Sequence, residues 1–87
     1  MEVETTSLKE VEEALEAKAE VIMLDNMSPA EALAAVEKIG GRAKVEISGG
    51  ISLENVREYA VAGPDFISVG ALTHSAPAVD ISLNMEP

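Results

Sequence analysis

Four residues of this chain could bind or react with a small molecule, and they recur at a nearly constant spacing. Glu4, Asp25, Ser48 and Gly70 are separated by 21, 23 and 22 positions, by subtraction of their numbers. The two carboxylates could bind sugar hydroxyls or a metal ion that carries a diphosphate. Two glycines follow Ser48 and allow backbone N–H groups to approach a phosphate closely. These residue types suggest a ribose 5-phosphate group between the carboxylates and the glycines.

A second loop of small residues begins at the fourth of these positions. Neighbouring loops of this kind commonly bind one phosphate between them. His74, the only histidine, follows this loop and could donate a hydrogen bond to the ligand, but a structural role is equally compatible with the sequence. Taken alone, the glycine pair after Ser48 favours a simple tight turn. The predicted phosphate-binding residues are Ser48, Gly49, Gly50, Gly70, Ala71, Leu72 and His74.

Four strands and three helices are expected to position these residues. Alternating or continuous apolar runs predict strands at about Glu2–Thr5, Glu20–Asp25, Ala43–Ser48 and Asp65–Val69. Residues 71–75 are predicted to form a turn or a short helix, and residues 79–83 a last strand or extended segment.

Serine residues mark the expected start of each helix. Ser7 and Ser28 are each followed three residues later by glutamate, which is a capping-box pattern, and Pro29 stands at the first helical position. Ser52 is predicted to begin the third helix directly after the glycine pair. The predicted buried faces comprise Leu8, Val11, Ala14 and Leu15 in the first helix, Leu33, Val36 and Ile39 in the second, and Leu53, Val56, Tyr59 and Ala60 in the third.

The regular alternation of strand and helix indicates an α/β fold. Repeated βα units without a change of strand order favour parallel strands that form part of an open (β/α) barrel, similar to a TIM barrel, over a doubly wound sheet. No linker interrupts residues 1–87, which we interpret as one domain. In such barrels the active site lies at the carboxyl ends of the strands. Strand alternation places Glu2, Met23, Lys44, Glu46 and Ser68 on the same inward face as the four candidate residues.

The charge of the chain limits its partners. Its net charge is −10, and no basic patch could neutralise nucleic acid or an anionic membrane surface. No apolar run is long enough to span a membrane, no cysteine is present, and the acidic N-terminus has no signal-peptide pattern, so a cytoplasmic protein is expected. Only Lys44 is basic at an inward position. Because an anionic ligand requires cations, further basic residues are expected from another segment or subunit.

Several segments resemble the C-terminal part of the quinolinate phosphoribosyltransferase family, also called carboxylating nicotinate-nucleotide pyrophosphorylases. The resemblance covers essentially the whole chain, and its most specific parts are Leu-Asp-Asn, Ser-Gly-Gly and Val-Gly-Ala-Leu-Thr-His-Ser in this order. The matching segments are Glu2–Glu4, Ile22–Met27, Glu46–Ile51, Asp65–Pro77 and Asp80–Leu83.

The resemblance implies an enzyme of cytoplasmic NAD synthesis. Quinolinate and phosphoribosyl pyrophosphate, with Mg²⁺, would give nicotinate mononucleotide, pyrophosphate and CO₂. Glu4 and Asp25 would be the catalytic residues, close to the ribose and to Mg²⁺ bound with the diphosphate. They would stabilise positive charge that develops at the anomeric carbon. The loops at 48–50 and 70–72 would bind the 5′-phosphate, and His74 lies in the family motif near that site.

The family also uses parts that we do not find in this sequence. Its N-terminal domain and early barrel strands supply arginines and lysines, and one arginine comes from a dimer partner. The chain is therefore expected to supply the ribose-phosphate side of the site within a homo-oligomer and to be inactive alone. A related barrel enzyme, such as a molybdenum-associated paralogue, is an alternative that the Thr73–Pro77 segment disfavours. A non-catalytic half-barrel that self-associates through its exposed strand edges is another.

Overall fold

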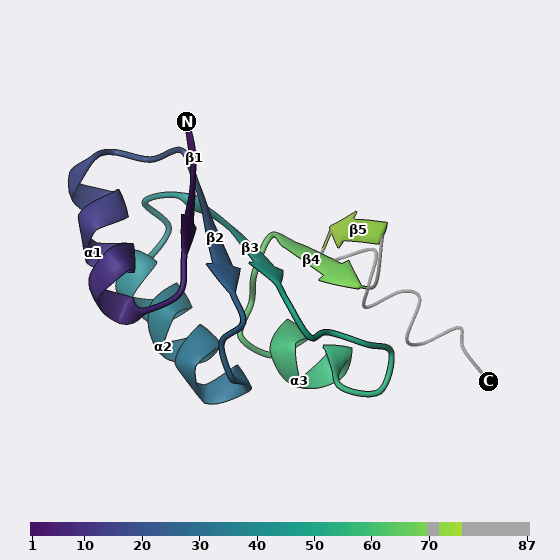
Figure 1. Cartoon of the computed structure of the whole chain (residues 1–87). Coiled ribbons are helices and arrows are strands. Elements are labelled where there is room, and N and C mark those ends of the chain that lie inside the picture. The colour runs from purple at the N-terminus through teal and green to yellow at the C-terminus, as the bar shows by residue number, and fades with distance from the viewer. Residues whose placement is uncertain (70–71, 76–87) are drawn as a thin grey trace.

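Five short segments form the strands of one sheet, and three helices connect the first four strands (Figure 1). The computed structural model describes residues 1–69 and 72–75. Each of the first four strands pairs in parallel with the next. The elements are β1 (Glu2–Thr5), α1 (Leu8–Glu16), β2 (Val21–Asp25), α2 (Pro29–Ile39), β3 (Lys44–Ser48), α3 (Val56–Ala60), β4 (Phe66–Val69) and β5 (Leu72–Ser75).

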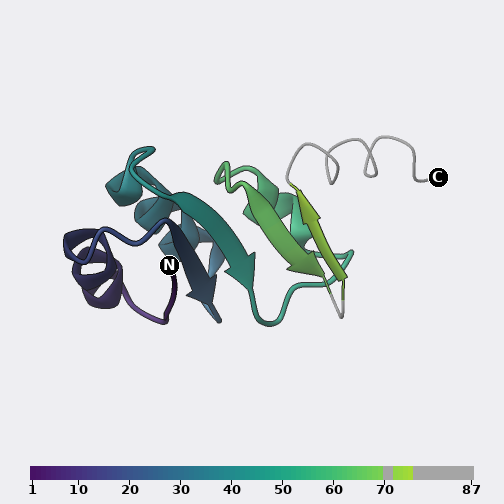
Figure 2. The same cartoon turned by 90° about the horizontal axis from the view of Figure 1, so that it is seen from above.

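The strands lie side by side in the order in which the chain makes them (Figure 2). In a doubly wound sheet the strand order would reverse partway along the sheet, and helices would lie on both faces. Here α1, α2 and α3 all lie on one face, as in the wall of a barrel (Figure 2). The parallel sheet of a partial, TIM-like barrel is therefore confirmed. Within residues 1–69 and 72–75, no helix is long and apolar enough to cross a membrane.

The core lies between the helices and the face of the sheet that they cover. Every second residue of β2 and β3 is buried there, as is Ile67 of β4, and α1, α2 and α3 cover them with aliphatic side chains and Tyr59. Full burial of one such aliphatic side chain contributes about 1.5–3 kcal/mol. The fully or nearly fully buried residues of β2, β3 and β4 are Ile22, Leu24, Val45, Ile47 and Ile67.

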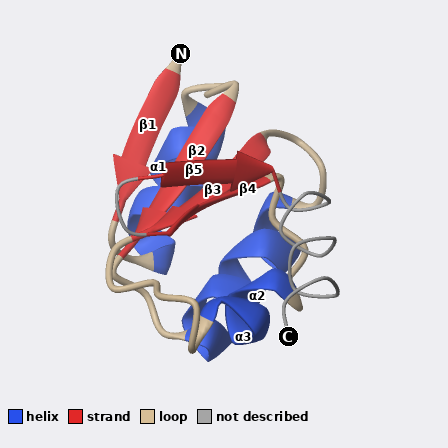
Figure 3. Ribbon diagram, turned by 90° about the vertical axis from the view of Figure 1, so that its right-hand side faces the viewer, coloured by secondary structure: helices blue, strands red, loops and turns tan. Residues whose placement is uncertain are grey.

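No helix of the described chain covers the opposite face of the sheet (Figure 3). The strand register places one polar-rich set of residues on this open face, and none of them is fully buried. Apart from Gly70, which lies outside the described residues, the predicted inward set is confirmed, because it alternates with the residues that face the helices. The open face comprises Glu2, Glu4, Val21, Met23, Asp25, Lys44, Glu46, Ser48, Phe66 and Ser68.

The two predicted capping patterns begin α1 and α2. Ser28 and Glu31 form a complete capping box, in which each side chain accepts a hydrogen bond from the other residue's backbone N–H. At α1, Ser7 accepts from the Glu10 N–H, but the Glu10 carboxylate accepts from the N–H of Thr6, one residue earlier than a capping box requires. These backbone N–H groups lower the pKa of Glu10 and of Glu31.

The predicted buried faces of the helices need correction. In α2 the fully buried residues are Ala32, Ala35 and Ile39, whereas Leu33 is exposed. Small alanines on the inner face allow the helix to pack directly on the strands. Leu53 is 64% exposed because α3 begins only at Val56, and Leu8, at the start of α1, is also exposed. An apolar side chain near a helix terminus can project past the edge of the sheet, and periodicity does not reveal this.

The prediction of a turn or short helix over residues 71–75 is wrong. Leu72–Ser75 form β5, which pairs antiparallel with β4 (Figure 2). Only two residues separate the strands, the commonest length for a hairpin connection. β4 pairs with β3 on one side, so its other edge would otherwise present unpaired N–H and C=O groups. The predicted strand at 79–83 lies outside the described residues, and the single domain over 1–87 stays a prediction.

Candidate functional site

Asp25 and Ser48 lie next to each other at the carboxyl end of the sheet. They are register partners, and each is the last residue of its strand. β1 instead ends at Thr5, and Glu4 pairs with Met23, two residues before Asp25. From the strand spacing and the rise per residue, the Cα atoms of Glu4 and Asp25 are about 8 Å apart. Glu4 therefore lies one layer below Asp25, although both carboxylates belong to the open face.

The loops that follow β2 and β3 are in direct contact. The Asn26 N–H donates a hydrogen bond to the Ser48 carbonyl (3.0 Å). Asn26 has a left-handed backbone conformation with φ of 58°, which asparagine tolerates better than most residues. Gly49 has φ of 87°, and a Cβ atom there would lie 2.5 Å from Asp25 Oδ1 and 2.7 Å from the Asn26 nitrogen. The Gly49 backbone therefore lies directly against the Asp25 carboxylate.

The loop after Gly49 is organised by Asn55. Its Nδ2 donates to the Gly50 carbonyl (3.0 Å), and its Oδ1 accepts from the Ser52 N–H (2.8 Å). These bonds stabilise a turn, so α3 begins at Val56 and not at Ser52. Residues 51–55 therefore separate the glycine pair from the five-residue helix α3, and the prediction that a helix begins at Ser52, directly after the glycine pair, is wrong. Any phosphate in this loop would contact the N–H groups of the loop itself.

Tyr59 connects α3 to the segment that directly follows Asp25. Its hydroxyl donates a hydrogen bond to the Met27 carbonyl (2.7 Å), and both residues are buried, at 7% and 3% exposed. The segment 25–27 is therefore fixed by β3, Gly49 and α3 together.

Replacing Tyr59 with phenylalanine is expected to destabilise the fold. The ring would still fill its space, but the buried Met27 carbonyl would lose its partner, at a cost of about 1–3 kcal/mol. Thermal unfolding followed by circular dichroism should show a melting temperature lower by about 4–8 °C per kcal/mol. Thr6→Val is the matched control, because it also removes one hydroxyl, but from an exposed hydrogen bond to Glu10. Equal melting temperatures for the two variants would show that the Tyr59 bond contributes nothing.

The rest of the open face is acidic and polar. The Ser68 hydroxyl donates to Glu46 Oε2 (3.1 Å), which links β4 to β3, and Glu46 lies one layer below Asp25. Lys44 and Glu2 lie in the lowest layer, separated by Val21 in the register, and no ion pair joins them in the described part of the chain. Both side chains are exposed at this rim of the sheet. Lys44 is the one basic residue of the described open face.

The second predicted loop is only partly described. Gly70 and Ala71 lie outside the described residues, and β4 ends at Val69, where the sequence predicted the strand to end. Leu72 and His74 lie on β5 and not at a helix start, with His74 opposite Ile67 in the register. Their predicted phosphate binding is not tested by this arrangement.

Comparison with known proteins shows the family of this chain. The family model described as quinolinate phosphoribosyl transferase, C-terminal domain, matches residues 1–84. This chain belongs to that family. A probable carboxylating nicotinate-nucleotide pyrophosphorylase of Methanocaldococcus jannaschii is 46% identical over 98% of this chain and 32% of its own length. The chloroplastic carboxylating enzyme of Arabidopsis thaliana is 45% identical over 99% of this chain and 29% of its own length.

The fold agrees with a solved structure of the same family. The nicotinate-nucleotide pyrophosphorylase of Ehrlichia chaffeensis superposes with a TM-score of 0.76 at 38% identity, over 79% of this chain and 25% of that one. The chain thus spans about a third of the length of the curated relatives that it matches. It corresponds to the C-terminal domain of the quinolinate phosphoribosyltransferase family.

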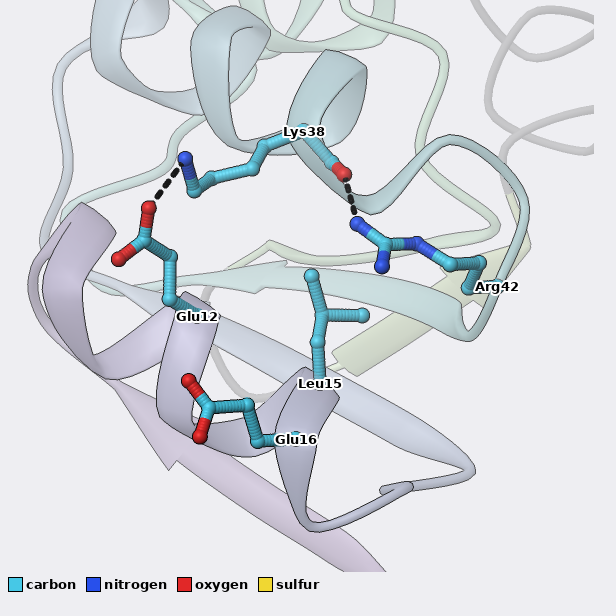
Figure 4. Close-up of a pocket in the computed structure, with 5 residues that line it drawn as sticks. All are labelled: Glu12, Leu15, Glu16, Lys38 and Arg42. Carbon is cyan, nitrogen blue, oxygen red and sulfur yellow. Dashed lines mark hydrogen bonds and ion pairs between the residues drawn. The ribbon is translucent and has the colours of Figure 1, made fainter.

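A pocket of about 410 Å³ lies between α1 and α2, on the opposite side of the sheet (Figure 4). The Lys38 ammonium and the Glu12 carboxylate form an ion pair across it, and the Arg42 Nη2 donates to the Lys38 carbonyl (2.7 Å). Lys38 lowers the pKa of Glu12. The pocket lies at the C-terminal ends of the helices, hence at the amino ends of the strands, where barrels of this type carry stabilising and not catalytic residues. We assign it a structural role.

The described residues could bind Mg²⁺ only with the help of a ligand. No group of three histidine, aspartate or glutamate side chains in this part of the chain is close enough to bind a metal ion alone. Mg²⁺ usually retains several waters and is bound by one or two carboxylates together with substrate phosphates. Asp25, with Glu4 one layer below it, fits this second mode.

Asn26 and Tyr59 are the positioning residues that the sequence did not assign. Asn26 stands in the Leu-Asp-Asn motif, and asparagine directly after a strand is a known signal for a left-handed turn. Tyr59 was expected only as part of a buried face. A tyrosine on the buried face of a helix must place its hydroxyl against a polar partner, which is a signal that could have suggested the bond to Met27.

Proposed function

We propose that this chain forms the ribose-phosphate side of the active site of a quinolinate phosphoribosyltransferase. The enzyme would convert quinolinate and phosphoribosyl pyrophosphate into nicotinate mononucleotide, pyrophosphate and CO₂. The observation that carries the proposal is the contact between Asp25 and the Ser48–Gly49 loop, within a chain that belongs to this family. A carboxylate and a glycine loop side by side suit a ligand with a sugar next to a phosphate.

Asp25 and Glu4 would act through their negative charge. As pyrophosphate leaves, positive charge develops at the anomeric carbon of the ribose, and fixed carboxylates stabilise it without reorganisation. Because Asp25 lies at the strand end and Glu4 one layer deeper, Asp25 would contribute more. Mg²⁺, bound with the diphosphate, would neutralise the leaving group.

The 5′-phosphate would bind to backbone N–H groups of the glycine loop. Gly50 suits this role because its surroundings are open, with no heavy atom within 4 Å of the place that a Cβ atom would take. Ser48 and Gly49 would contribute with it. Gly70, Ala71, Leu72 and His74 are proposed to complete the phosphate site from the part of the chain that follows β4.

The chain would depend on basic residues from elsewhere. Phosphoribosyl pyrophosphate and quinolinate are both strongly anionic, whereas the net charge of the chain is −10 and Lys44 is the one cation of the described open face. Arginine and lysine residues from the remainder of the enzyme, in a homo-oligomer, would supply the balance. The proposed cytoplasmic location stays a prediction from the sequence.

A chimeric enzyme tests the function directly. The matching third of the Methanocaldococcus jannaschii relative would be replaced by this chain, and formation of nicotinate mononucleotide from quinolinate and phosphoribosyl pyrophosphate would be measured. We expect Mg²⁺-dependent product formation, with the unaltered relative as the reference. A chimera that unfolds cooperatively but forms no product would contradict the proposal.

A further inference from the structure

Gly49 forms part of the loop after β3, and it also lies against the side chain of Asp25. A Cβ atom at this position would lie 2.5 Å from Asp25 Oδ1, 2.7 Å from the backbone nitrogen of Asn26 and 3.2 Å from its Cα. Separations of 2.5 to 2.7 Å are well below van der Waals contact. A residue with a Cβ would force the loop 25–26 to move.

The loop 25–26 has little freedom to yield. Asp25 is fixed in the strand register opposite Ser48, and the Asn26 N–H is bound to the Ser48 carbonyl. The Tyr59 hydroxyl anchors the chain at Met27, one residue further on. The Asp25 carboxylate therefore lies in a space that is bounded on one side by the bare backbone of Gly49.

We propose that Gly49 is a positioning residue for the Asp25 carboxylate. Because Gly49 has no Cβ atom, the Asp25 carboxylate can lie beside the glycine loop that follows β3. The consequence for catalysis rests on the proposed function, whereas the positioning itself does not. Placement matters because displacing a catalytic group by about 1 Å can lower a rate by about 100-fold.

Gly50 provides a matched control within the same loop. It also has positive φ, 70° against 87° for Gly49, so a substitution at either position forces an L-residue into the left-handed region. No heavy atom lies within 4 Å of a Cβ at Gly50. The two alanine variants therefore share the backbone cost, and only Gly49→Ala adds the collision with Asp25.

The test compares Gly49→Ala with Gly50→Ala in the 87-residue chain by NMR. We expect the side-chain carboxyl ¹³C resonance of Asp25 to shift in Gly49→Ala and to stay in place in Gly50→Ala. In the chimeric enzyme, Gly49→Ala should lower kcat by about 10- to 100-fold. It should change KM for phosphoribosyl pyrophosphate by less than about twofold, because the loop still presents its N–H groups.

Equal shifts of the Asp25 resonance in both variants would overturn the proposal, because the effect would then come from the shared backbone conformation. If Gly49→Ala does not fold, the test uses the unaltered chain. Nuclear Overhauser contacts are then expected from the Gly49 Hα atoms to the Asn26 N–H and to the Asp25 Hβ atoms. Absence of these contacts would overturn the proposal. An inactive chimera carrying the unaltered chain would contradict the proposed function but not the positioning role of Gly49, because the Asp25 resonance is measured without substrate.

Discussion

Replacing Asp25 with asparagine in the chimeric enzyme is expected to lower kcat by about 100- to 1,000-fold. Asparagine retains the size of the side chain and one oxygen next to Gly49, but it has no negative charge. Loss of one preorganised electrostatic group in an active site typically costs this much. The quantity to measure is the steady-state rate of nicotinate mononucleotide formation at saturating substrate, with protein stability checked by urea unfolding.

The control for Asp25→Asn is Glu37→Gln, which removes the same charge from an exposed position on α2, on the covered side of the sheet. Its kcat should stay within about twofold, because an exposed charge at a distance is screened by solvent and salt. Glu4→Gln should have an intermediate effect, since Glu4 lies one layer below Asp25. If Asp25→Asn and Glu37→Gln have the same kcat, Asp25 does not act on the transition state.

The arrangement of the open face could be read from the sequence because a strand has a strict period of two. Once Val45 and Ile47 are recognised as buried, Glu46 and Ser48 must point to the other side. The parallel sheet followed from the repeat of strand and helix, and the starts of α1 and α2 from local capping chemistry. Each of these features depends on residues close together in the chain.

The features that the sequence did not reveal depend on residues far apart in the chain. Gly49 meets Asp25 only because β2 and β3 pair in one register, and the bond from Tyr59 to Met27 spans 32 residues. Nor does an apolar pattern show where a helix begins. Asn55 donates a hydrogen bond to the Gly50 carbonyl, so α3 begins only after this turn and Leu53 is exposed to solvent. Local sequence patterns predicted which face of the sheet a residue lies on, whereas the strand register determines which distant residues are in contact.

Ile47→Ala is expected to destabilise the fold by about 2–5 kcal/mol, through lost burial and the cavity that remains. Ile47 is 0% exposed in the third of the four parallel strands. Domains of this size have total stabilities of roughly 4–13 kcal/mol. The variant should therefore lose much of its stability, and the midpoint of urea unfolding should fall with an unchanged slope.

Leu53→Ala is the informative control, because the sequence pattern predicted Leu53 to be buried and the structure leaves it 64% exposed. Its cost should stay within about 0.5 kcal/mol, as for most surface substitutions. Similar losses for Leu53→Ala and Ile47→Ala would mean that α3 begins at Ser52 and buries Leu53. The glycine pair would then lead directly into a helix, and the helix N-terminus would again be available to a phosphate. This stability measurement therefore also distinguishes between two ways of binding the ligand: through the N–H groups of an open loop, or through the end of a helix.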